Sequence, residues 1–537
     1  MARILVVGSG ASGVHFTLTA LRRGHTVTML DVGYPRADPP APEATFEALK
    51  EELEDPAAYF LGPDGQGVVY PGGTSFFGHP PSKHYVFKHA PDLRVRTDGM
   101  SPLFTFARGG FAEAWTGGCY PFSADDLKDY PLTYDDLHPH YAEVARRIGI
   151  GGTRDDLESF MPFDVDYQGS LPLDPHSRYL LERYAKHRDH LHRSPGFWLG
   201  RSRVATLSEE HNGRPACSEL GRCLWGCPTQ SLWAPSVTLR ECHEFEGFRY
   251  VSGELVRYFE YDSDGIVSSV STVPVGEGSG VPATSYSADA VVLAAGTLGS
   301  SRIVLESLAR RTGGTYRMPG LMDNRQVHMP FLTPALIGAE PNLASYQFHH
   351  LAFAVRSSRA VGDVHGQITA LKSASLHPIL TAMPTGARSA LDLFRRVRTA
   401  LGIANINLHD SRRVESHLGL EYDADGGSRL VVCYKPDHDE LHRRRMAIRR
   451  VRRALLRLGA VAVPGLTRTL PMGASVHYSG TMPMSTAPAG MSVDPSCRSH
   501  TFPNLFVIDG SVLPSLPAKN LTFTLMANAV RVATVAF

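Results

Sequence analysis

Three of the chain's seven cysteines are concentrated in one short stretch, RPACSELGRCLWGCPT at 214–229. They follow the spacing C-x5-C-x3-C, and Pro228 comes directly after the last thiol. Zinc is disfavoured because its usual C-x2–4-C pairs are absent, and a disulfide is disfavoured in a reducing compartment. A loop that supplies several thiolates and ends in C-x3-C-P also occurs in iron–sulfur proteins. Cys217, Cys223 and Cys227 are therefore either ligands of a cluster or structural thiols.

A histidine and an asparagine near the C-terminus are the candidates for proton chemistry. His477 precedes a Gly-containing turn in GASVHYSGTMPMS, and Asn520 opens the apolar, helix-like segment NLTFTLMANAVRVA. An imidazole with an ordinary pKa of about 6.5 can act as a base at neutral pH. An amide at the start of a helix either caps that helix or belongs to a site. On residue type alone, a structural role and a catalytic role both stay open.

The first 31 residues contain the elements of a dinucleotide-binding site. ILVV predicts a buried strand that leads into G-x-G-x-x-G at Gly8, Gly10 and Gly13, followed by a helix and a second strand that ends in Asp31. In this motif the glycines permit a tight turn, close backbone approach to a pyrophosphate, and packing of helix on strand. Asp31 lies 18 residues after Gly13, where a carboxylate can accept a ribose hydroxyl. A motif this early leaves no catalytic domain before it, which suits FAD as a permanent cofactor.

Two later segments are predicted to add strands to the same sheet: ADAVVLAAGTLGSSRIVLES from Ala288 and NLFVIDGSVLPS from Asn504. We therefore expect an α/β fold in which a discontinuous, Rossmann-like FAD-binding domain is joined to an α+β substrate-binding domain with an antiparallel sheet. The predicted FAD-binding domain comprises 1–120, 200–325 and 474–537. The predicted substrate-binding domain comprises 121–199 and 326–473.

Two helices are predicted within the substrate-binding segments. A Thr-x-x-Asp cap opens a helical pattern at 133–150. Residues 438–459 form an amphipathic pattern with eight arginines and an apolar stripe of Leu441, Ile448, Val451, Leu455 and Leu458. The arginines are more simply interpreted as a solvated helix face than as a docking face for an acidic partner.

Composition and charge exclude several classes of protein. The chain has 537 residues, of which 43% are hydrophobic and 20% charged, as in ordinary globular proteins. A net charge of +1 gives no reason to expect binding to nucleic acid. No apolar run approaches the roughly 18 residues that a membrane span needs, and MARILVVGSGASG lacks the pattern of a signal peptide. We therefore expect no membrane insertion and a cytoplasmic location.

Several motifs, occurring in a fixed order, make the chain resemble the glucose–methanol–choline (GMC) oxidoreductases. They are GSGASG at 8–13, RGGFAEAWTGG at 108–118, AAGTLGSSRIVLES at 294–307, HYSGTMPM at 477–484, and NLFVIDGSVLPS with KNLTFTLMANAVR near the end. The resemblance is closest to FAD sugar dehydrogenases and pyranose-oxidase-like members. It implies that His477 takes the hydroxyl proton of an alcohol while a hydride passes to flavin N5. It also implies that Asn520 holds the hydroxyl oxygen, although the usual Asn-Pro is Asn520-Leu521 here.

The resemblance extends to the cofactor. In pyranose-oxidase-like members a histidine just before the tryptophan of the flavin loop can carry a covalent flavin bond. Ala114 occupies that position here, so we expect non-covalent FAD, and Thr116 falls where a hydroxyl could reach flavin N5. The predicted FAD contacts are Gly8, Gly10, Ala11, Ser12, Gly13, Asp31, Arg108, Gly109, Gly110, Trp115, Thr116, Gly117, Val256, Ala295, Gly296, Thr297, Asp509, Gly510, Leu521 and Thr522.

The cysteine loop also has a counterpart in the resembled family. Large subunits of FAD glucose, fructose and gluconate dehydrogenases carry a [3Fe–4S] cluster on a C-x5-C-x3-C-P stretch. The resemblance therefore implies a cluster on Cys217, Cys223 and Cys227 as the alternative to structural thiols. Cluster-bearing members pass electrons to a cytochrome subunit. No C-x-x-C-H haem motif occurs here, so such an electron-accepting partner would be a separate chain.

The predicted function is FAD-dependent oxidation of an alcohol on a sugar-like, polyhydroxylated substrate. An aminosugar or another secondary-metabolite alcohol is the alternative substrate. One alternative function is an oxidase that uses oxygen directly and has no cluster. Another is a flavin-fold module that binds partner proteins without catalysis, against which His477 and Asn520 in their motifs argue.

Overall fold

A five-stranded parallel sheet is built from three distant parts of the chain. The computed structural model describes residues 1–36, 43–62, 79–90, 93–162, 164–275, 283–357, 362–371, 383–423 and 427–537. The strand order is β20-β9-β1-β2-β5, so both later segments add a strand to this sheet as predicted. The strands are β1 (Arg3–Val7), β2 (Thr26–Leu30), β5 (Phe248–Val251), β9 (Ala290–Leu293) and β20 (Leu505–Val507).

Helices follow the strands of this sheet, as in other Rossmann-like folds. α1 contacts both α6 and α11, and α4 packs on α11. α4 begins at the predicted capping box, in which Thr133 and Asp136 bond each other's backbone N–H. α7 contacts β6 of a three-stranded sheet, β6-β7-β8. The bounds are α1 (Ala11–Arg22), α4 (Tyr134–Ile148), α6 (Pro235–His243), α7 (Gly296–Thr312), α11 (Thr522–Val535), β6 (Glu254–Tyr261), β7 (Val267–Pro274) and β8 (Thr284–Tyr286).

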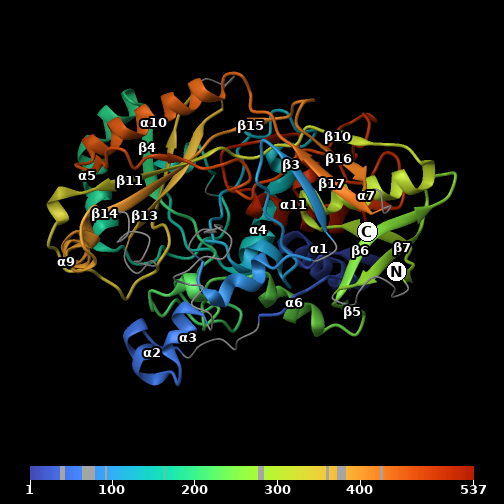
Figure 1. The fold of residues 1–537 in the computed structure, drawn as a ribbon, viewed down its shortest axis with the longest axis horizontal. Coiled ribbons are helices and arrows are strands. Elements are labelled where there is room, and N and C mark those ends of the chain that lie inside the picture. Colours follow the sequence, from blue (N-terminus) through green and yellow to red (C-terminus); the bar gives the residue numbers. More distant parts are fainter. Residues whose placement is uncertain are drawn as a thin grey trace.

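A seven-stranded antiparallel sheet forms the second large layer, beside α5 (Pro175–Arg193) and α10 (Glu440–Arg457) in Figure 1. Its order is β18-β11-β14-β13-β12-β4, and β19 also pairs with β11. The strands are β4 (Phe197–Arg201), β11 (Gln326–Leu332), β12 (Leu351–Val355), β13 (Val364–Ala370), β14 (Leu401–Asn407), β18 (Val461–Ala462) and β19 (Arg468–Thr469). A parallel sheet with helices joined to an antiparallel sheet confirms the predicted fold class.

Smaller elements complete the described chain. A four-stranded sheet has the order β10-β16-β17-β3, and β15 pairs with β21. The bounds are β3 (Arg94–Asp98), β10 (Arg317–Pro319), β15 (Asp410–Ser411), β16 (His417–Tyr422), β17 (Ser428–Cys433), β21 (Ser515–Leu516), α2 (Phe46–Glu52), α3 (Pro56–Leu61) and α9 (Ala387–Val397).

The seven-stranded sheet has one apolar and one polar face. Val364 and Ile368 of β13 belong to a buried cluster that also contains Leu180 of α5 and Val451 of α10. Side chains alternate between the faces of a strand, so His365 and Gln367 of β13 lie on the opposite face. Their register partners on β14 are Asn407 and Asn405, which share that face. This face of the sheet therefore carries buried amides and an imidazole.

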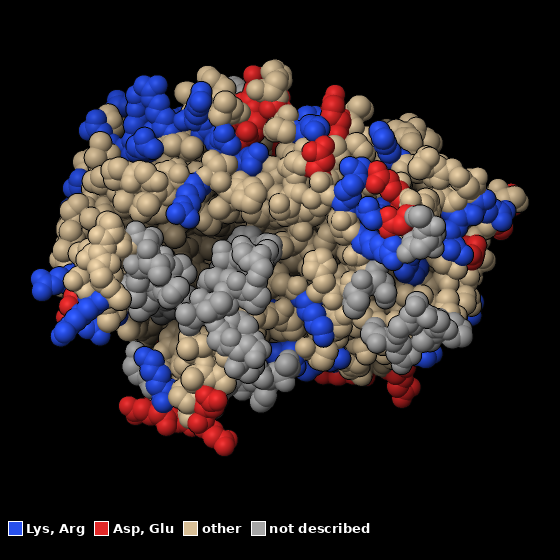
Figure 2. Space-filling model, in the orientation of Figure 1, with Lys and Arg blue, Asp and Glu red and all other residues tan. Residues whose placement is uncertain are grey.

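The arginine-rich helix at 438–459 is present as α10, and its polar side faces solvent. Figure 2 shows Lys and Arg gathered over α10 and α5. Val451, Leu455 and Leu458 are buried as predicted, whereas Leu441 is 43% exposed because it lies in the first turn of the helix. Within the described ranges, no helix combines the length and apolarity that crossing a bilayer requires.

Candidate active site

A cavity of about 250 Å³ lies at the carboxyl ends of the parallel strands. The loops after β1, β2, β9 and β20 contribute to it, which is the usual ligand position in a doubly wound sheet. It brings most of the predicted FAD contacts together: Gly8, Gly10, Ala11, Ser12, Asp31, Gly109, Gly110, Val256, Ala295, Gly296, Thr297, Asp509, Gly510, Leu521 and Thr522.

The three glycines of the G-x-G-x-x-G motif allow the tight turn, the close helix packing and the open space that a dinucleotide needs. Gly8 adopts φ +102°, a conformation that favours glycine. A Cβ on Gly13 would lie 2.1 Å from the carbonyl oxygen of Gly8, so only glycine permits this approach of helix to turn. A Cβ on Gly10 would meet nothing within 4 Å, so the space that a pyrophosphate needs is open at this backbone. The turn therefore fits a dinucleotide cofactor.

Asp31 lines the same cavity as the glycine turn, and two hydroxyl groups hold its carboxylate in place. Its Oδ2 accepts hydrogen bonds from Ser9 Oγ and, at 3.1 Å, from Tyr250 Oη. The Ser9 hydroxyl in turn accepts the backbone N–H of Gly109 at 2.8 Å. Burial raises the pKa of Asp31 to about 6. Ser9 and Tyr250 were not predicted, because their roles depend on loops that meet only in the folded chain.

Five predicted FAD contacts lie outside the lining of this cavity: Gly13, Arg108, Trp115, Thr116 and Gly117. Gly13 packs on the turn, and the Arg108 guanidinium lies over the Tyr250 ring at 5.2 Å. Trp115 donates its indole N–H to the carbonyl of Trp233 at 2.8 Å. The Thr116 hydroxyl lies 3.1 Å from Nε2 of His349. These bonds fix the flavin loop against neighbouring segments.

His477 is a buried histidine held by its neighbours. It is 8% exposed, and burial lowers the pKa of its imidazole to about 4. Nδ1 lies 2.8 Å from Oδ1 of Asn324, and the backbone N–H donates to Ser475 Oγ at 3.0 Å. Ser475 donates in turn to Asp323, and the preceding Val476 adopts φ +56°. The ring is therefore both neutral at ordinary pH and fixed in position.

Asn520 faces the polar side of the seven-stranded sheet and does not cap α11. Its Oδ1 accepts a hydrogen bond from Gln367 Nε2 at 2.6 Å. The residue that precedes α11 is Leu521, and no side chain caps this helix. Asn324, which touches His477, also donates to the carbonyl of Pro517 at 3.1 Å, three residues before Asn520. The side chain of Asn324 therefore contacts both His477 and the segment that leads to Asn520.

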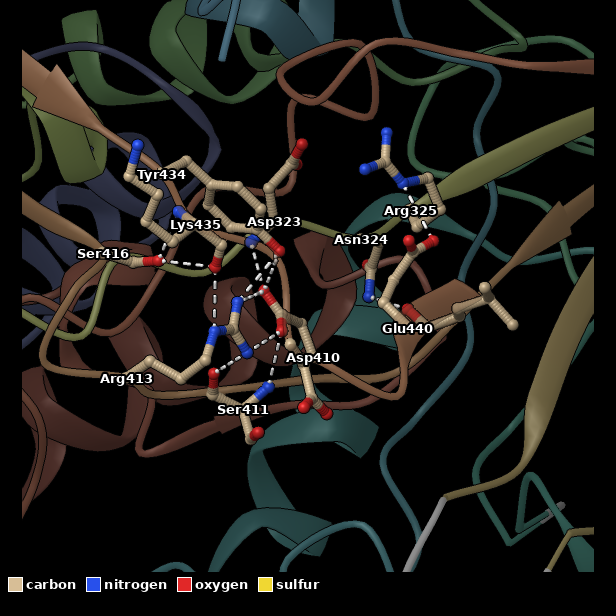
Figure 3. A network of polar contacts seen from close by, with 12 residues as sticks. Asp323, Asn324, Arg325, Asp410, Ser411, Arg413, Ser416, Tyr434, Lys435 and Glu440 are labelled. Atoms are coloured by element: carbon tan, nitrogen blue, oxygen red, sulfur yellow. Dashed lines mark hydrogen bonds and ion pairs between the residues drawn. The ribbon is translucent and has the colours of Figure 1, made fainter. Parts of the chain in front are cut away.

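A polar network that includes Asp323, Asp410 and Arg413 surrounds the segment that carries Asn324 (Figure 3). Asp410 accepts hydrogen bonds from Arg413 at 2.7 Å, from Tyr434 Oη at 2.9 Å and from the backbone N–H of Asp323 at 3.1 Å. Asp323 accepts the N–H of Gly473 at 2.6 Å, and burial raises its pKa to about 7. The network fixes both the segment that carries Asn324 and the turn that leads to His477.

Neither Asn324 nor Gln367 was predicted from the sequence. Asn324 stands just before β11, and nothing local distinguishes it from a turn residue. Gln367 does leave a signal, because VHGQITA of β13 alternates polar and apolar side chains in a buried strand. The contact between this polar face and Asn520 forms only in the folded chain, so the strand pattern alone does not predict it.

The three cysteines of the 214–229 loop pack against one hydrophobic cluster, which contains Leu232, Tyr346 and Phe348. All three are free thiols. Burial raises the pKa of the free Cys217 thiol to about 11. Among the residues that the structure describes, no group of three or more Cys, His, Asp or Glu side chains is placed to hold a metal ion. The loop as folded here therefore does not fit a three-thiolate cluster.

Comparisons with known proteins point to one family. A family model described as GMC oxidoreductase matches residues 416–529. The chain is 25% identical to 6'''-hydroxyparomomycin C oxidase of Streptomyces lividus, over 98% of this chain and 90% of that protein. It is 23% identical to the fructose dehydrogenase large subunit of Gluconobacter japonicus, over 99% and 97%. The crystal structure of pyridoxine 4-oxidase from Mesorbium loti superposes with a TM-score of 0.56 at 15% identity, covering 99% of both chains.

Proposed function

The chain belongs to the GMC oxidoreductases, FAD-dependent enzymes that act on CH–OH donors, and on this premise we propose that His477 is the base that deprotonates a sugar-like alcohol. When bound, FAD supplies the hydride acceptor for the alcohol carbon. The turn from Gly8 to Gly13 would hold its pyrophosphate, and Asp31 its ribose. The predicted domain boundaries and non-covalent binding at Ala114 form part of the same proposal.

The observation that carries the proposal is a buried, neutral imidazole beside a fixed amide. Burial lowers the pKa of His477 to about 4, so the ring is unprotonated above that pH and can accept a proton. A neutral imidazole that takes a hydroxyl proton leaves electron density on the alcohol oxygen, which favours departure of the hydride.

Asn520 is proposed to bind the alcohol oxygen. Its Oδ1 is already used by Gln367, so its Nδ2–H₂ group is the part left to donate. A fixed donor at the place where negative charge develops stabilises the transition state more than the ground state. Gln367 therefore supports the reaction by orienting the amide.

The polar sheet face supports a polyhydroxylated substrate. In the described part of the chain, both ring nitrogens of His365 and the side-chain oxygens of Asn405 and Asn407 are buried without a hydrogen-bond partner. Such groups are costly unless a ligand or water satisfies them, and sugar hydroxyls both donate and accept. Two of the relatives described above are named for a hydroxyparomomycin and for fructose, which are molecules of this kind.

The physiological electron acceptor is a separate part of the proposal. The Streptomyces relative is named an oxidase, whereas the Gluconobacter relative is a large subunit of a dehydrogenase. Peroxide formed in air during turnover would identify oxygen as acceptor. Turnover that needs a cytochrome would instead favour a separate electron-accepting chain, and turnover that needs only a quinone would favour a small-molecule acceptor.

Anaerobic reduction of the holoenzyme tests the function. Sugars, glycosides, aminosugars and simple alcohols are added in turn, and loss of the oxidised flavin absorbance is followed. We expect at least one polyhydroxylated compound to reduce the flavin, and His477→Ala to retain FAD but react at least about 100-fold more slowly. A holoenzyme that no alcohol reduces would instead favour the non-catalytic, protein-binding alternative.

A further inference from the structure

We propose that Asn324 is the positioning residue that sets the tautomer of His477, so that Nδ1 carries the ring proton and Nε2 is the nitrogen that accepts the substrate proton. This inference rests on the proposed function of His477 as the base. It is based on the three hydrogen bonds of the Asn324 side-chain amide. Nδ2 of Asn324 donates to the carbonyl oxygens of Leu408, at 2.8 Å, and Pro517, at 3.1 Å, and Oδ1 lies 2.8 Å from Nδ1 of His477.

The orientation of the amide follows from its two carbonyl partners. A carbonyl oxygen only accepts hydrogen bonds, so the NH₂ end of Asn324 must face Leu408 and Pro517. The reversed amide would place an oxygen against two oxygens and would leave both carbonyls without this donor. Oδ1 must therefore be the end that faces His477.

The tautomer of the imidazole then follows from the amide. Oδ1 is an acceptor only, so a hydrogen bond to it requires a proton on Nδ1 of His477. A neutral imidazole has one N–H, so Nε2 carries the lone pair. The opposite tautomer would place the Nδ1 lone pair against the Oδ1 lone pairs in a buried site, where such repulsion is poorly screened.

Anchors on both sides hold Asn324 in this position (Figure 3). The backbone N–H of Asp323 donates to Asp410 at 3.1 Å, and the Asp323 carboxylate accepts the N–H of Gly473 at 2.6 Å. On the other side, Arg325 donates to Glu440 at 3.1 Å and to the carbonyl of Leu470 at 3.0 Å. The amide is thus fixed by its neighbours as well as by its own bonds.

A neutral partner also distinguishes this histidine from one paired with a carboxylate. A carboxylate at Nδ1 would stabilise the imidazolium and raise the pKa of the ring. The amide accepts the same hydrogen bond without adding charge. The variants below leave unchanged the charged or titratable groups that surround this arrangement, which include Asp323, Asp410, Arg413, Arg325, Glu440 and His365.

Two substitutions separate positioning from a merely structural role. Asn324→Leu and Asn324→Asp both remove the NH₂ donor to the Leu408 and Pro517 carbonyls, but only Asn324→Asp keeps an acceptor for Nδ1–H. Asn504→Leu is the matched control, because Asn504 bonds the backbone N–H and carbonyl of Val267 in the same way but lies outside the site. Each holoenzyme is compared in FAD content, melting temperature, and anaerobic flavin reduction from pH 5 to 9.

We expect Asn324→Leu to slow flavin reduction at least about tenfold at saturating substrate, with little change in KM. Asn324→Asp should be faster than Asn324→Leu at pH 8 because it keeps the acceptor for Nδ1–H, but slower than the wild type because its second oxygen faces the Leu408 and Pro517 carbonyls. The Asp variant should also lose rate at higher pH than the wild type, because its charge favours the imidazolium. The control should match the wild type. Equal losses in the Leu and Asp variants, with no difference between their pH profiles, would overturn the positioning role.

A second measurement does not depend on catalysis. Nitrogen NMR of protein labelled with ¹⁵N-histidine reports the tautomer, and His477→Gln identifies the resonance. The wild type and Asn324→Asp should show Nδ1–H, and Asn324→Leu a mixture. Nε2–H in the wild type would refute the inference. A wild type with Nδ1–H whose flavin no alcohol reduces would instead refute only the proposed function.

Discussion

Lowering the pH tests directly whether the buried imidazole of His477 is the base. Burial lowers the pKa of this ring to about 4, so at pH 5 about 90% of it is still neutral. A histidine with the ordinary pKa of about 6.5 would be only about 3% neutral at that pH. If neutral His477 is required for hydride release, the reduction rate at pH 5 should stay within twofold of its value at pH 8. An ordinary histidine would cause a loss of about 30-fold.

The assay is anaerobic stopped-flow reduction of the holoenzyme by a saturating substrate between pH 4 and 8. Asp323 titrates in this range, because burial raises its pKa to about 7. Asp323→Asn therefore serves as the control that identifies any change of rate near neutrality that belongs to this carboxyl. A rate that falls tenfold per pH unit below about 6.5, in both the wild type and Asp323→Asn, would refute the reasoning.

The same shift predicts a change in stability with pH. The folded pKa of His477 lies below its unfolded value, so between about pH 6.5 and pH 4 the unfolded chain binds more protons at this residue. Stability should therefore decrease as pH falls through this window, by at most about 3 kcal/mol from this one residue. His477→Gln should show a smaller decrease in melting temperature over the same range. An equal decrease in both proteins would show that other groups dominate.

Other predictions address the cofactor, the oriented amide and the cysteines. Gly13→Ala should lose FAD and melt at a lower temperature, because its Cβ would lie 2.1 Å from the Gly8 carbonyl oxygen, whereas Gly386→Ala, with nothing within 4 Å, should behave as the wild type. Gln367→Leu should lower kcat/KM about tenfold, the effect of losing one hydrogen bond that orients Asn520; an unchanged value would remove Gln367 from the mechanism. Acid precipitation should release all the flavin, since Ala114 offers no covalent link, and yellow pellets would contradict this. Iron and acid-labile sulfide should be absent from anaerobically purified protein, and about three irons per flavin would restore the cluster on Cys217, Cys223 and Cys227.

Much of the fold could be predicted because its signals are local. The strand, glycine turn, helix and acidic residue of the first 31 positions are contiguous, and each requires its neighbours for a steric reason. The Thr133 capping box likewise fixes the start of α4 within four residues. The discontinuous sheet could be predicted because a short apolar run followed by a glycine turn is recognisable wherever it occurs in the chain. Leu441 was misplaced because a helical pattern does not show which turn extends beyond the core.

The candidate site was only half determined by the sequence. Motif similarity identified His477 and Asn520, and residue type sufficed to suggest a base and a hydrogen-bond donor. The tertiary structure alone brought Asn324, just before β11, and Gln367, in the middle of β13, to those two residues. Both are amides whose orientation depends on carbonyls and side chains more than 80 residues away. The spacing of the cysteines likewise left two outcomes open, since ligation depends on where the thiols point after packing. Composition and local pattern thus determine which elements form, whereas the partners of a buried polar atom are decided by how those elements pack.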